Sequence, residues 1–264
     1  MSEYKRTPQF ACILSTGRTG TKAIAHHLDG WEPGVVARHE PALSWLLGVA
    51  SNMYRCKRIQ RRQLAWLLAR TRRKRIAAGA ARLYVESNPF LCGFIDVLDE
   101  VLGEVRVIHI VRHPGTYVTS ALDWGSLSGL KGVASNSFPY WVCKPELLEA
   151  QPVRSWGEMS EPEQLAWRWA NTNRYLNRAE ALLGDRYLRI RYEELFDPGQ
   201  RGLDRIVNWL GLAAAAEGPD ERVLPTLNAS RRGDHLRHWD WPPELRDRVI
   251  DLCGDLMELY GYEL

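Results

Sequence analysis

The chain has 264 residues, of which 45% are hydrophobic, and its formal net charge is only +3. A chain of this length and composition can bury one sizeable core, so a single domain over residues 1–264 is expected. The small net charge gives no reason to expect nucleic acid as a partner. No stretch of the sequence approaches the ~20 apolar residues of a membrane-spanning helix, and the N-terminus does not read as a secretory signal. We therefore expect a cytoplasmic protein.

The cysteines support the same compartment. Five are present, they are widely scattered, and no two are arranged as C-x-x-C. Such a set predicts reduced thiols and indicates neither a disulfide framework nor a zinc site.

Short apolar runs with strand character alternate with helical patterns along the chain. The runs that read as strands are residues 10–15, 34–38, 83–87, 105–111 and 187–191. Helical patterns are predicted over residues 20–28, 43–53, 55–81 (one or two helices), 90–102, 115–125, 163–183, 201–210 and 243–260. This alternation predicts an α/β fold in which a parallel sheet is flanked by helices.

Two stretches lack a clear period. Residues 126–162 are rich in Gly, Ser, Pro and Trp and predict a long loop or irregular insertion on the substrate side. Residues 213–243 form a second irregular stretch, which contains the basic run S-R-R-G-D.

The first strand leads through a glycine-containing loop into a helix, in the sequence F-A-C-I-L-S-T-G-R-T-G-T-K-A from Phe10. A helix N-terminus exposes unpaired N–H groups and the positive end of the helix dipole, and Arg18 and Lys22 add full charges beside them. The pattern predicts a phosphate or sulfate site. It is not the G-x-x-x-x-G-K-[ST] signature, because Ala23 follows the lysine and offers no hydroxyl for magnesium.

A second strand predicts another anion contact. Residues 105–125 read V-R-V-I-H-I-V-R-H-P-G-T-Y-V-T-S-A-L-D-W-G, so Arg112 stands at the strand's end and Ser120 lies in the following helix. Ligands of open parallel sheets bind at the carboxyl ends of the strands. Both side chains could therefore hold one phosphate, the arginine in a bidentate manner.

Together, the two segments resemble the cofactor signatures of the sulfotransferase family, whose members have a P-loop NTPase-like fold and use 3′-phosphoadenosine 5′-phosphosulfate (PAPS). The resemblance implies that Arg18, Thr19, Gly20, Thr21 and Lys22 grip the 5′-phosphosulfate. It also implies that Arg112 and Ser120 hold the 3′-phosphate.

The likeness extends to L-A-W-R-W-A-N-T-N-R-Y-L at 165–176, to L-R-I-R-Y-E-E-L-F-D-P at 188–198, and to the ending L-Y-G-Y-E-L. The arginine at position 18 looks more like the carbohydrate and bacterial branches of the family. Many members close the 3′-phosphate site with a late R-K-G-x-x-G-D-W-K motif, which the chain matches only in part. The resemblance places Arg231, Arg232 and Gly233 in that role, and a solvated basic loop is the alternative.

In-line sulfuryl transfer needs positioning, charge stabilisation and a base, and this scheme requires no metal. Lys22 and Arg18 are the candidates for stabilising the leaving group. Glu40 and His39 follow the second predicted strand and could each take the acceptor's proton. A similar E-P pair in carbohydrate-type sulfotransferases implies that Glu40 is the base, with His39 second.

The acceptor is expected to be a small molecule or a carbohydrate. Trp124, Trp141 and Trp156 lie in or beside the irregular insertion and offer aromatic faces to it. No Asp or Glu occurs between Glu40 and Glu86, whereas eleven Lys or Arg do. The basic stretch 55–82 could attract an acidic glycan, an anionic membrane surface or nucleic acid, form a substrate lid or dimer contact, or be a solvated helix face.

Two further functions remain open on the sequence. A P-loop nucleotide kinase or hydrolase would require magnesium, which the missing hydroxyl after Lys22 disfavours. A non-catalytic anion-binding protein would use the basic helix as its interaction surface.

Overall fold

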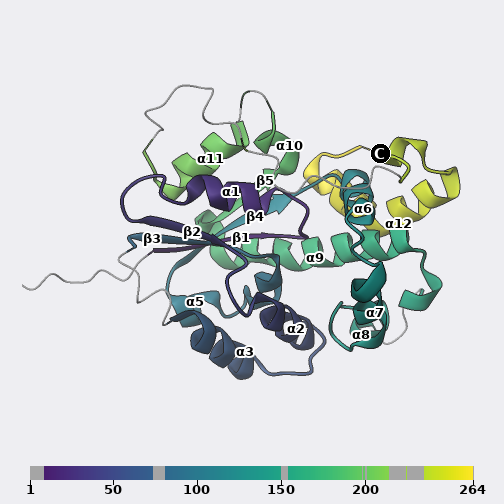
Figure 1. Cartoon of the computed structure of the whole chain (residues 1–264), viewed down its shortest axis with the longest axis horizontal. Helices are drawn as coiled ribbons and strands as arrows, with labels where there is room; N and C mark the ends of the chain where they lie inside the picture. The colour runs from purple at the N-terminus through teal and green to yellow at the C-terminus, as the bar shows by residue number, and fades with distance from the viewer. Residues whose placement is uncertain are drawn as a thin grey trace, which may run out of the picture.

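The computed structural model describes residues 9–73, 81–149, 154–197, 199, 201–213, 224 and 235–263. Its centre is a five-stranded parallel sheet with the strand order β2-β3-β1-β4-β5 (Figure 1). The strands are β1 (Gln9–Ser15), β2 (Val35–His39), β3 (Leu83–Ser87), β4 (Val105–Val111) and β5 (Tyr187–Arg191). The predicted α/β class and parallel sheet are confirmed.

The centre of the sheet is recognisable in the sequence because the residues of its middle strands, β3, β1 and β4, are almost all buried. In β1, six of the seven residues are buried, and only Gln9 is exposed. Parallel strands covered by helices on both sides read as continuous hydrophobic runs. Since all five strands run in one direction, the residues that follow them meet at one edge of the sheet.

Helices cover both faces of the sheet (Figure 1). One face carries α1 (Thr21–Leu28), α10 (Tyr192–Leu195) and α11 (Arg201–Leu210). The other carries α2 (Ser44–Arg55), α3 (Arg61–Leu68), α5 (Leu98–Leu102) and the long α9 (Glu161–Leu183). A third apolar cluster joins α9 to α6 (Pro114–Asp123) and α12 (Pro243–Tyr260) beside the sheet.

Two predicted segments differ from the structure. Residues 90–102 form a 3₁₀ turn, η2 (Pro89–Phe94), and the separate α5 rather than one helix. The Asn88 side chain accepts a hydrogen bond from the Phe90 N–H at 3.0 Å and so caps this turn.

The insertion at 126–162 is more regular than expected, since it contains α7 (Gly129–Ser137), α8 (Pro145–Leu148) and the 3₁₀ turn η3 (Trp156–Glu158). Its small residues hide the helical period.

The basic stretch does not form one continuous charged helix. Within its described part, α2 ends at Arg55, α3 follows, and a π-helical turn, η1 (Ala69–Arg73), comes next. Arg61 pairs with Glu100 at the surface. The Arg72 side chain is fully buried against Glu86. Part of the charge expected at the surface is therefore internal.

Two general features concern the described residues as a whole. None of their helices is both long and apolar enough to cross a bilayer. The five cysteines are buried free thiols, and the Sγ atoms of Cys56 and Cys143 lie 4.0 Å apart.

Candidate active site

A cavity of about 890 Å³ opens at the carboxyl edge of the sheet. Its walls come from the β1–α1 loop, the ends of β2, β4 and β5, and helices α2, α6, α7 and α9. We call it the central cavity. Its volume lies near the upper end of the range for small-molecule sites, about 300–1,000 Å³.

The loop between β1 and α1, residues 16–20, has left-handed backbone at three positions. The φ angles of Gly17, Arg18 and Gly20 are 81°, 56° and 71°. Successive N–H groups in such a turn form a concave anion-binding nest. The last residue of β1 fixes this loop, because the Ser15 Oγ accepts hydrogen bonds from the Gly17 N–H at 3.0 Å and the Thr19 hydroxyl at 2.8 Å. The polar contacts thus fix the shape of this loop, which we call the anion loop.

Gly20 allows a close approach that another residue would prevent. A Cβ at this position would lie 2.8 Å from the ring of Phe196, which stacks beside Tyr192. Helix α1 begins directly afterwards, with no side-chain cap and no acidic residue in its first turn. Its N-terminal amides therefore add to the positive potential of the anion loop.

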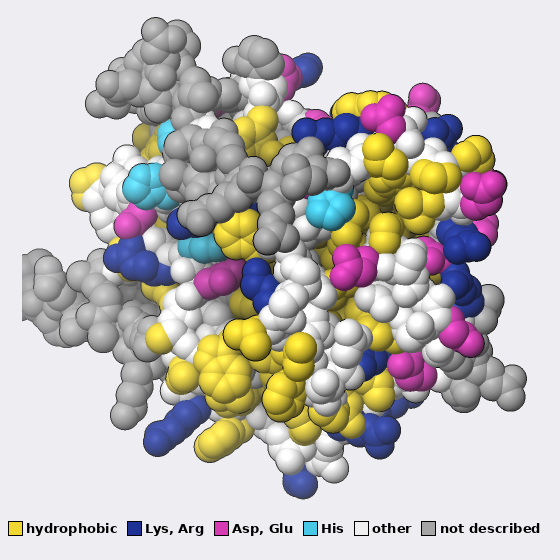
Figure 2. All heavy atoms as spheres, turned by 45° about the vertical axis from the view of Figure 1, so that its right-hand side comes forward, with side chains coloured by type: hydrophobic (Ala, Val, Ile, Leu, Met, Phe, Trp, Pro, Cys, Tyr) yellow, Lys and Arg dark blue, Asp and Glu magenta, His cyan; other side chains and the backbone are white. Residues whose placement is uncertain are grey.

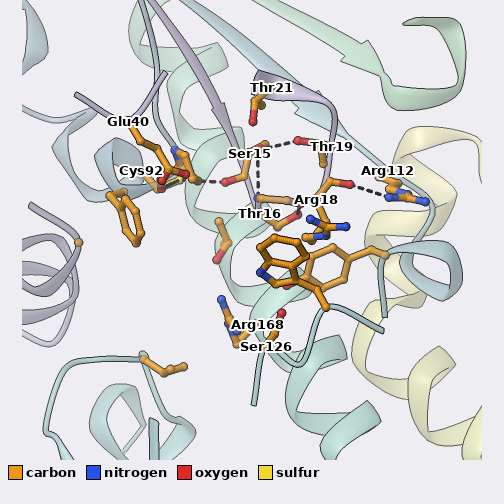
Figure 3. Close-up of a pocket in the computed structure, with 18 of the residues that line it drawn as sticks. Ser15, Thr16, Arg18, Thr19, Thr21, Glu40, Cys92, Arg112, Ser126 and Arg168 are labelled. Atoms are coloured by element: carbon orange, nitrogen blue, oxygen red, sulfur yellow. Dashed lines mark hydrogen bonds between the residues drawn. The ribbon is translucent and has the colours of Figure 1, made fainter. Parts of the chain in front are cut away.

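The Arg18 side chain points across the central cavity (Figure 3). Its Nε donates to the Ser120 Oγ at 3.3 Å, and its guanidinium lies 4.6 Å from the centre of the Trp124 ring. Burial, followed by the charge of Arg112, lowers the pKa of Arg18 from its ordinary value. Two nearby cations in a partly dry site favour an anion between them.

Arg112 joins the two sequence motifs. Its guanidinium donates to the Arg18 carbonyl at 2.6 Å and, through Nε, to the Thr116 hydroxyl at 3.1 Å (Figure 3). The same group lies 4.2 Å from the centre of the Tyr192 ring. Burial lowers the pKa of Arg112, yet an arginine remains charged at neutral pH. The end of β4 and the anion loop thus share one cationic site.

Glu40 lies on the opposite side of the anion loop from Arg112 (Figure 3), and His39, which precedes it at the end of β2, also lines the cavity. The Glu40 N–H donates to the Ser87 carbonyl at 3.0 Å, which fixes the backbone where β2 ends. The His39 Nε2 lies 3.6 Å from a Glu40 carboxylate oxygen. Burial raises the pKa of Glu40, while the charge of Lys22 lowers it in part. A raised pKa suits a carboxylate that must accept a proton.

The hydrogen bonds of Ser87 assign the tautomer of His39. The Ser87 hydroxyl donates to the Thr21 carbonyl at 2.9 Å, so its oxygen is free only to accept from His39 Nδ1, which lies 3.3 Å away. Nδ1 therefore carries the hydrogen and Nε2 presents a lone pair toward Glu40. Burial and the charge of Lys22 lower the pKa of His39, which keeps the ring neutral at pH 7.

The chain was compared with known proteins. No family model and no curated protein sequence matches it. Among solved structures, the sulfotransferase domain from the curacin biosynthetic pathway is 15% identical, with 98% of this chain and 99% of that chain covered and a TM-score of 0.58. The sulfotransferase domain of the Synechococcus PCC 7002 olefin synthase is 18% identical, with 98% and 96% covered and a TM-score of 0.55. A sulfotransferase from Alicyclobacillus acidocaldarius is 13% identical, with 97% of both chains covered and a TM-score of 0.55.

The chain has the sulfotransferase fold. These matches confirm the fold that the sequence resemblance implies. The agreement extends over nearly the whole chain, so the strands that carry the two anion motifs belong to the shared architecture.

On this sulfotransferase fold, most of the predicted site residues meet in the central cavity: Arg18, Thr19, Gly20, Thr21, Lys22, His39, Glu40, Arg112 and Ser120. The three predicted contacts from the late basic run, Arg231, Arg232 and Gly233, lie outside the described residues. No group of three or more His, Cys, Asp or Glu that could hold a metal ion occurs in the described part of the chain.

The tryptophans divide between cavity and core. Trp124 and Trp141 line the central cavity, as the sequence predicts for residues beside the insertion. Trp156 does not, since it is buried in the third apolar cluster with its Nε1 bonded to Asn136. Its position in a 3₁₀ turn packed on α9 explains this difference. Trp167 and Trp169 on α9 are buried in the same cluster.

Sequence reasoning missed several residues that line the cavity: Trp45, Asn52, Arg55, Phe90, Lys131, Arg168, Tyr192 and Phe196. For Tyr192 and Phe196 a signal existed, because they directly follow the last strand of the sheet. The remaining residues lie on helices, and no local pattern marks which face of each helix meets the cavity.

Proposed function

We propose that this protein is a sulfotransferase that moves a sulfuryl group from PAPS to a hydroxyl of a small molecule or glycan. The observation that carries the proposal is the hydrogen bond from the Arg112 guanidinium to the Arg18 carbonyl at 2.6 Å. This bond joins two cationic motifs, and a donor with anions at both its 5′ and 3′ positions requires two such motifs. In the described lining of the same cavity, Glu40 is the sole carboxylate.

The described residues suit such a donor. The anion loop, with its left-handed turns and uncapped helix start, would receive the 5′-phosphosulfate. Arg112 and Ser120 would hold the 3′-phosphate, with Tyr192 behind the guanidinium. When bound, PAPS supplies an activated sulfuryl group. The chain's own task is to bind this donor, place the acceptor in line and handle one proton.

In this mechanism Glu40 accepts the proton of the acceptor hydroxyl as the oxygen attacks. Arg18 and Lys22 stabilise the negative charge that develops on the leaving group. Arg18 is already oriented by Ser120 and Trp124, so little reorganisation is needed. His39 Nε2, 3.6 Å from Glu40, is placed to take the proton onward after a small approach, because its lone pair faces the carboxyl group.

A kinase or hydrolase is the weaker alternative. The position after Lys22 is Ala23, which is buried and has no hydroxyl for a magnesium ion. A purely non-catalytic anion-binding role does not explain a carboxylate with a raised pKa beside the anion loop.

The first test is calorimetric titration without magnesium. Adenosine 3′,5′-bisphosphate (PAP), the product of PAPS, should bind well, whereas ADP, which lacks the 3′-phosphate, should bind much more weakly. Mass spectrometry of hydroxyl compounds incubated with PAPS then detects transfer. Equal affinity for PAP and ADP, or a magnesium requirement, would refute the proposal and favour the nucleotide kinase.

A further inference from the structure

The central cavity has a second group of cations away from the anion loop. Arg55 at the end of α2, Lys131 on α7 and Arg168 on α9 all line it. Figure 3 shows Arg168 beside Ser126, at the other end of the cavity from Thr21. The described lining places no carboxylate next to them, since Glu40 is its only acidic residue. This end of the cavity is therefore cationic without internal compensation.

Helix α9 is anchored on both sides of Arg168, whereas the Arg168 side chain makes no polar contact within the described part of the chain. Its neighbours on α9 anchor the helix, because the Trp167 Nε1 donates to the Cys143 carbonyl and the Trp169 Nε1 donates to the Arg112 carbonyl. The Arg168 guanidinium is half-buried and has no hydrogen bond or ion pair with any residue that the structure describes. By contrast, Arg174 and Arg178 on the same helix are both paired with aspartates.

Arg55 has an incomplete set of partners. One of its terminal nitrogens donates to the carbonyl and the side-chain oxygen of Asn171, at 3.1 and 2.8 Å, and its guanidinium lies 4.7 Å from the Tyr175 ring. Its Nε–H is buried and has no acceptor among the residues that the structure describes. Asn171 is one helical turn beyond Arg168, so both guanidinium groups reach the same wall of the cavity. Leaving the donors of Arg168 unpaired is costly, and an oxyanion in the cavity would satisfy them beside the charge of Arg55.

The mouth of the cavity is apolar. Trp45, Phe90 and Trp141 line it. Outside it, exposed hydrophobic side chains continue along the start of α2 and along α7. Figure 2 shows hydrophobic side chains, coloured yellow, gathered on the lower part of the face that it draws. The described surface there suits the body of an apolar molecule rather than a sugar chain alone.

We infer that the acceptor is an anionic amphiphile: a hydroxyl compound with an apolar body, whose oxyanion binds Arg168 and Arg55. This inference rests on the proposed function and names its acceptor class. The apolar body contacts Trp45, Phe90 and Trp141, and the hydroxyl group reaches Glu40. A carboxylate and a phosphate ester both supply the required oxyanion, and the test separates them.

Binding can be measured without turnover. The probes are ω-hydroxydodecanoate, its neutral amide ω-hydroxydodecanamide, and ω-hydroxydodecyl phosphate, each titrated calorimetrically into the PAP-free and the PAP-loaded protein. The two anions should bind at least about tenfold more tightly than the amide, and the tighter of the two identifies the oxyanion. Equal affinity for all three probes, or no measurable binding by any, would overturn the inference.

Variants locate the subsite. Arg168→Gln should weaken the anionic probes about tenfold, leave the amide unchanged and leave PAP affinity unchanged, while Arg168→Lys should restore part of the loss. The control is Arg174→Gln, which alters a paired arginine on the same helix outside the cavity and should change no probe. Loss of PAP affinity in Arg168→Gln would instead assign Arg168 to the donor.

The inference and the proposed function fail in different ways. If the protein binds anionic probes through Arg168 but transfers no sulfuryl group, the proposed function is wrong and only the anion-binding subsite stands. If it sulfates neutral hydroxyl compounds as well as the acids, the function stands and the acceptor class is wrong. With a working acceptor, Arg168→Gln should raise KM for the hydroxy acid far more than it lowers kcat.

Discussion

Arg72 donates hydrogen bonds from Nε to both carboxylate oxygens of Glu86, at 3.0 and 2.8 Å, and both side chains are completely buried. The same guanidinium donates to the Ala42 carbonyl and to the Ser44 hydroxyl. These acceptors lie just after Glu40, where Leu43 has a left-handed φ of 71°. The ion pair therefore supports the loop that carries the candidate base.

Breaking this pair should be strongly destabilising. Arg72→Met leaves Glu86 charged and unpaired in the core, so we expect the free energy of unfolding to fall by about 3–5 kcal/mol. Urea denaturation measures the loss. The double variant Arg72→Met/Glu86→Leu removes both charges and should recover a large part of it. A double variant as unstable as the single one would show that packing, and not charge, dominates here.

Glu40→Gln should lower kcat by about 100-fold and leave PAP affinity nearly unchanged, because the amide cannot accept the acceptor's proton. Steady-state kinetics and calorimetry check the two halves of this prediction. Full activity in Glu40→Gln would assign the base to His39.

The pH dependence of the native protein follows from the same group. Burial raises the pKa of Glu40, and the base works only when ionised. The rate should therefore decline as the pH falls through this raised pKa, at a higher pH than an ordinary glutamate would give. The acidic limb of the kcat/KM profile should be absent in Glu40→Gln, and its persistence would point to another titrating group.

Arg112→Ala should weaken PAP by ~10- to 100-fold, since it removes a charged donor from the proposed 3′-phosphate contact. ADP lacks that phosphate, so its affinity should fall much less. The comparison separates a lost phosphate contact from disturbance of the Arg18 carbonyl that Arg112 also binds. Equal losses for PAP and ADP would mean that Arg112 acts only through the anion loop.

His109 should make the fold sensitive to acid. It is fully buried, with Nδ1 2.7 Å from the Tyr187 hydroxyl and Nε2 2.9 Å from the Asn173 side-chain oxygen, and burial lowers its pKa from 6.5 to about 4. The unfolded chain takes up this proton first as the pH falls. Stability should thus be lost between pH 6.5 and about 4, with a slope of at most ~1.4 kcal/mol per pH unit. Urea titrations at several pH values measure the free energy of unfolding against pH. In His109→Gln this contribution to the slope should vanish, and an unchanged slope would contradict the prediction.

The strands could be predicted because burial on both faces makes central strands such as β1 nearly continuous apolar runs, and because the edge strands β2 and β5 still keep short apolar stretches. Glu40, Arg112 and Lys22 could be predicted as neighbours for a related reason, since Glu40 and Arg112 directly follow strands and Lys22 lies at the start of the helix after the loop that follows β1. Topology alone brings such positions to one edge of the sheet. His109 stands inside the apolar run of β4, a position that favours a core histidine with both nitrogens hydrogen-bonded.

The acceptor side could not be predicted in the same way. Arg168 and Arg55 reach the central cavity from helices, and their orientation depends on how α9 and α2 pack across the sheet. The Arg72–Glu86 pair joins a π-helical turn to β3, and no periodicity in the basic stretch distinguishes the buried Arg72 from the exposed Arg61 and Arg70. Tertiary packing decided these positions.

The contact between Gly20 and Phe196 links two positions that are 176 residues apart in the chain. A side chain larger than hydrogen at position 20 fits only if the aromatic ring at position 196 shrinks or moves. As related sequences diverge, the two positions should therefore change together rather than independently. A related sequence that has lost the glycine at position 20 but keeps an aromatic residue at position 196 should therefore have a donor site of different shape.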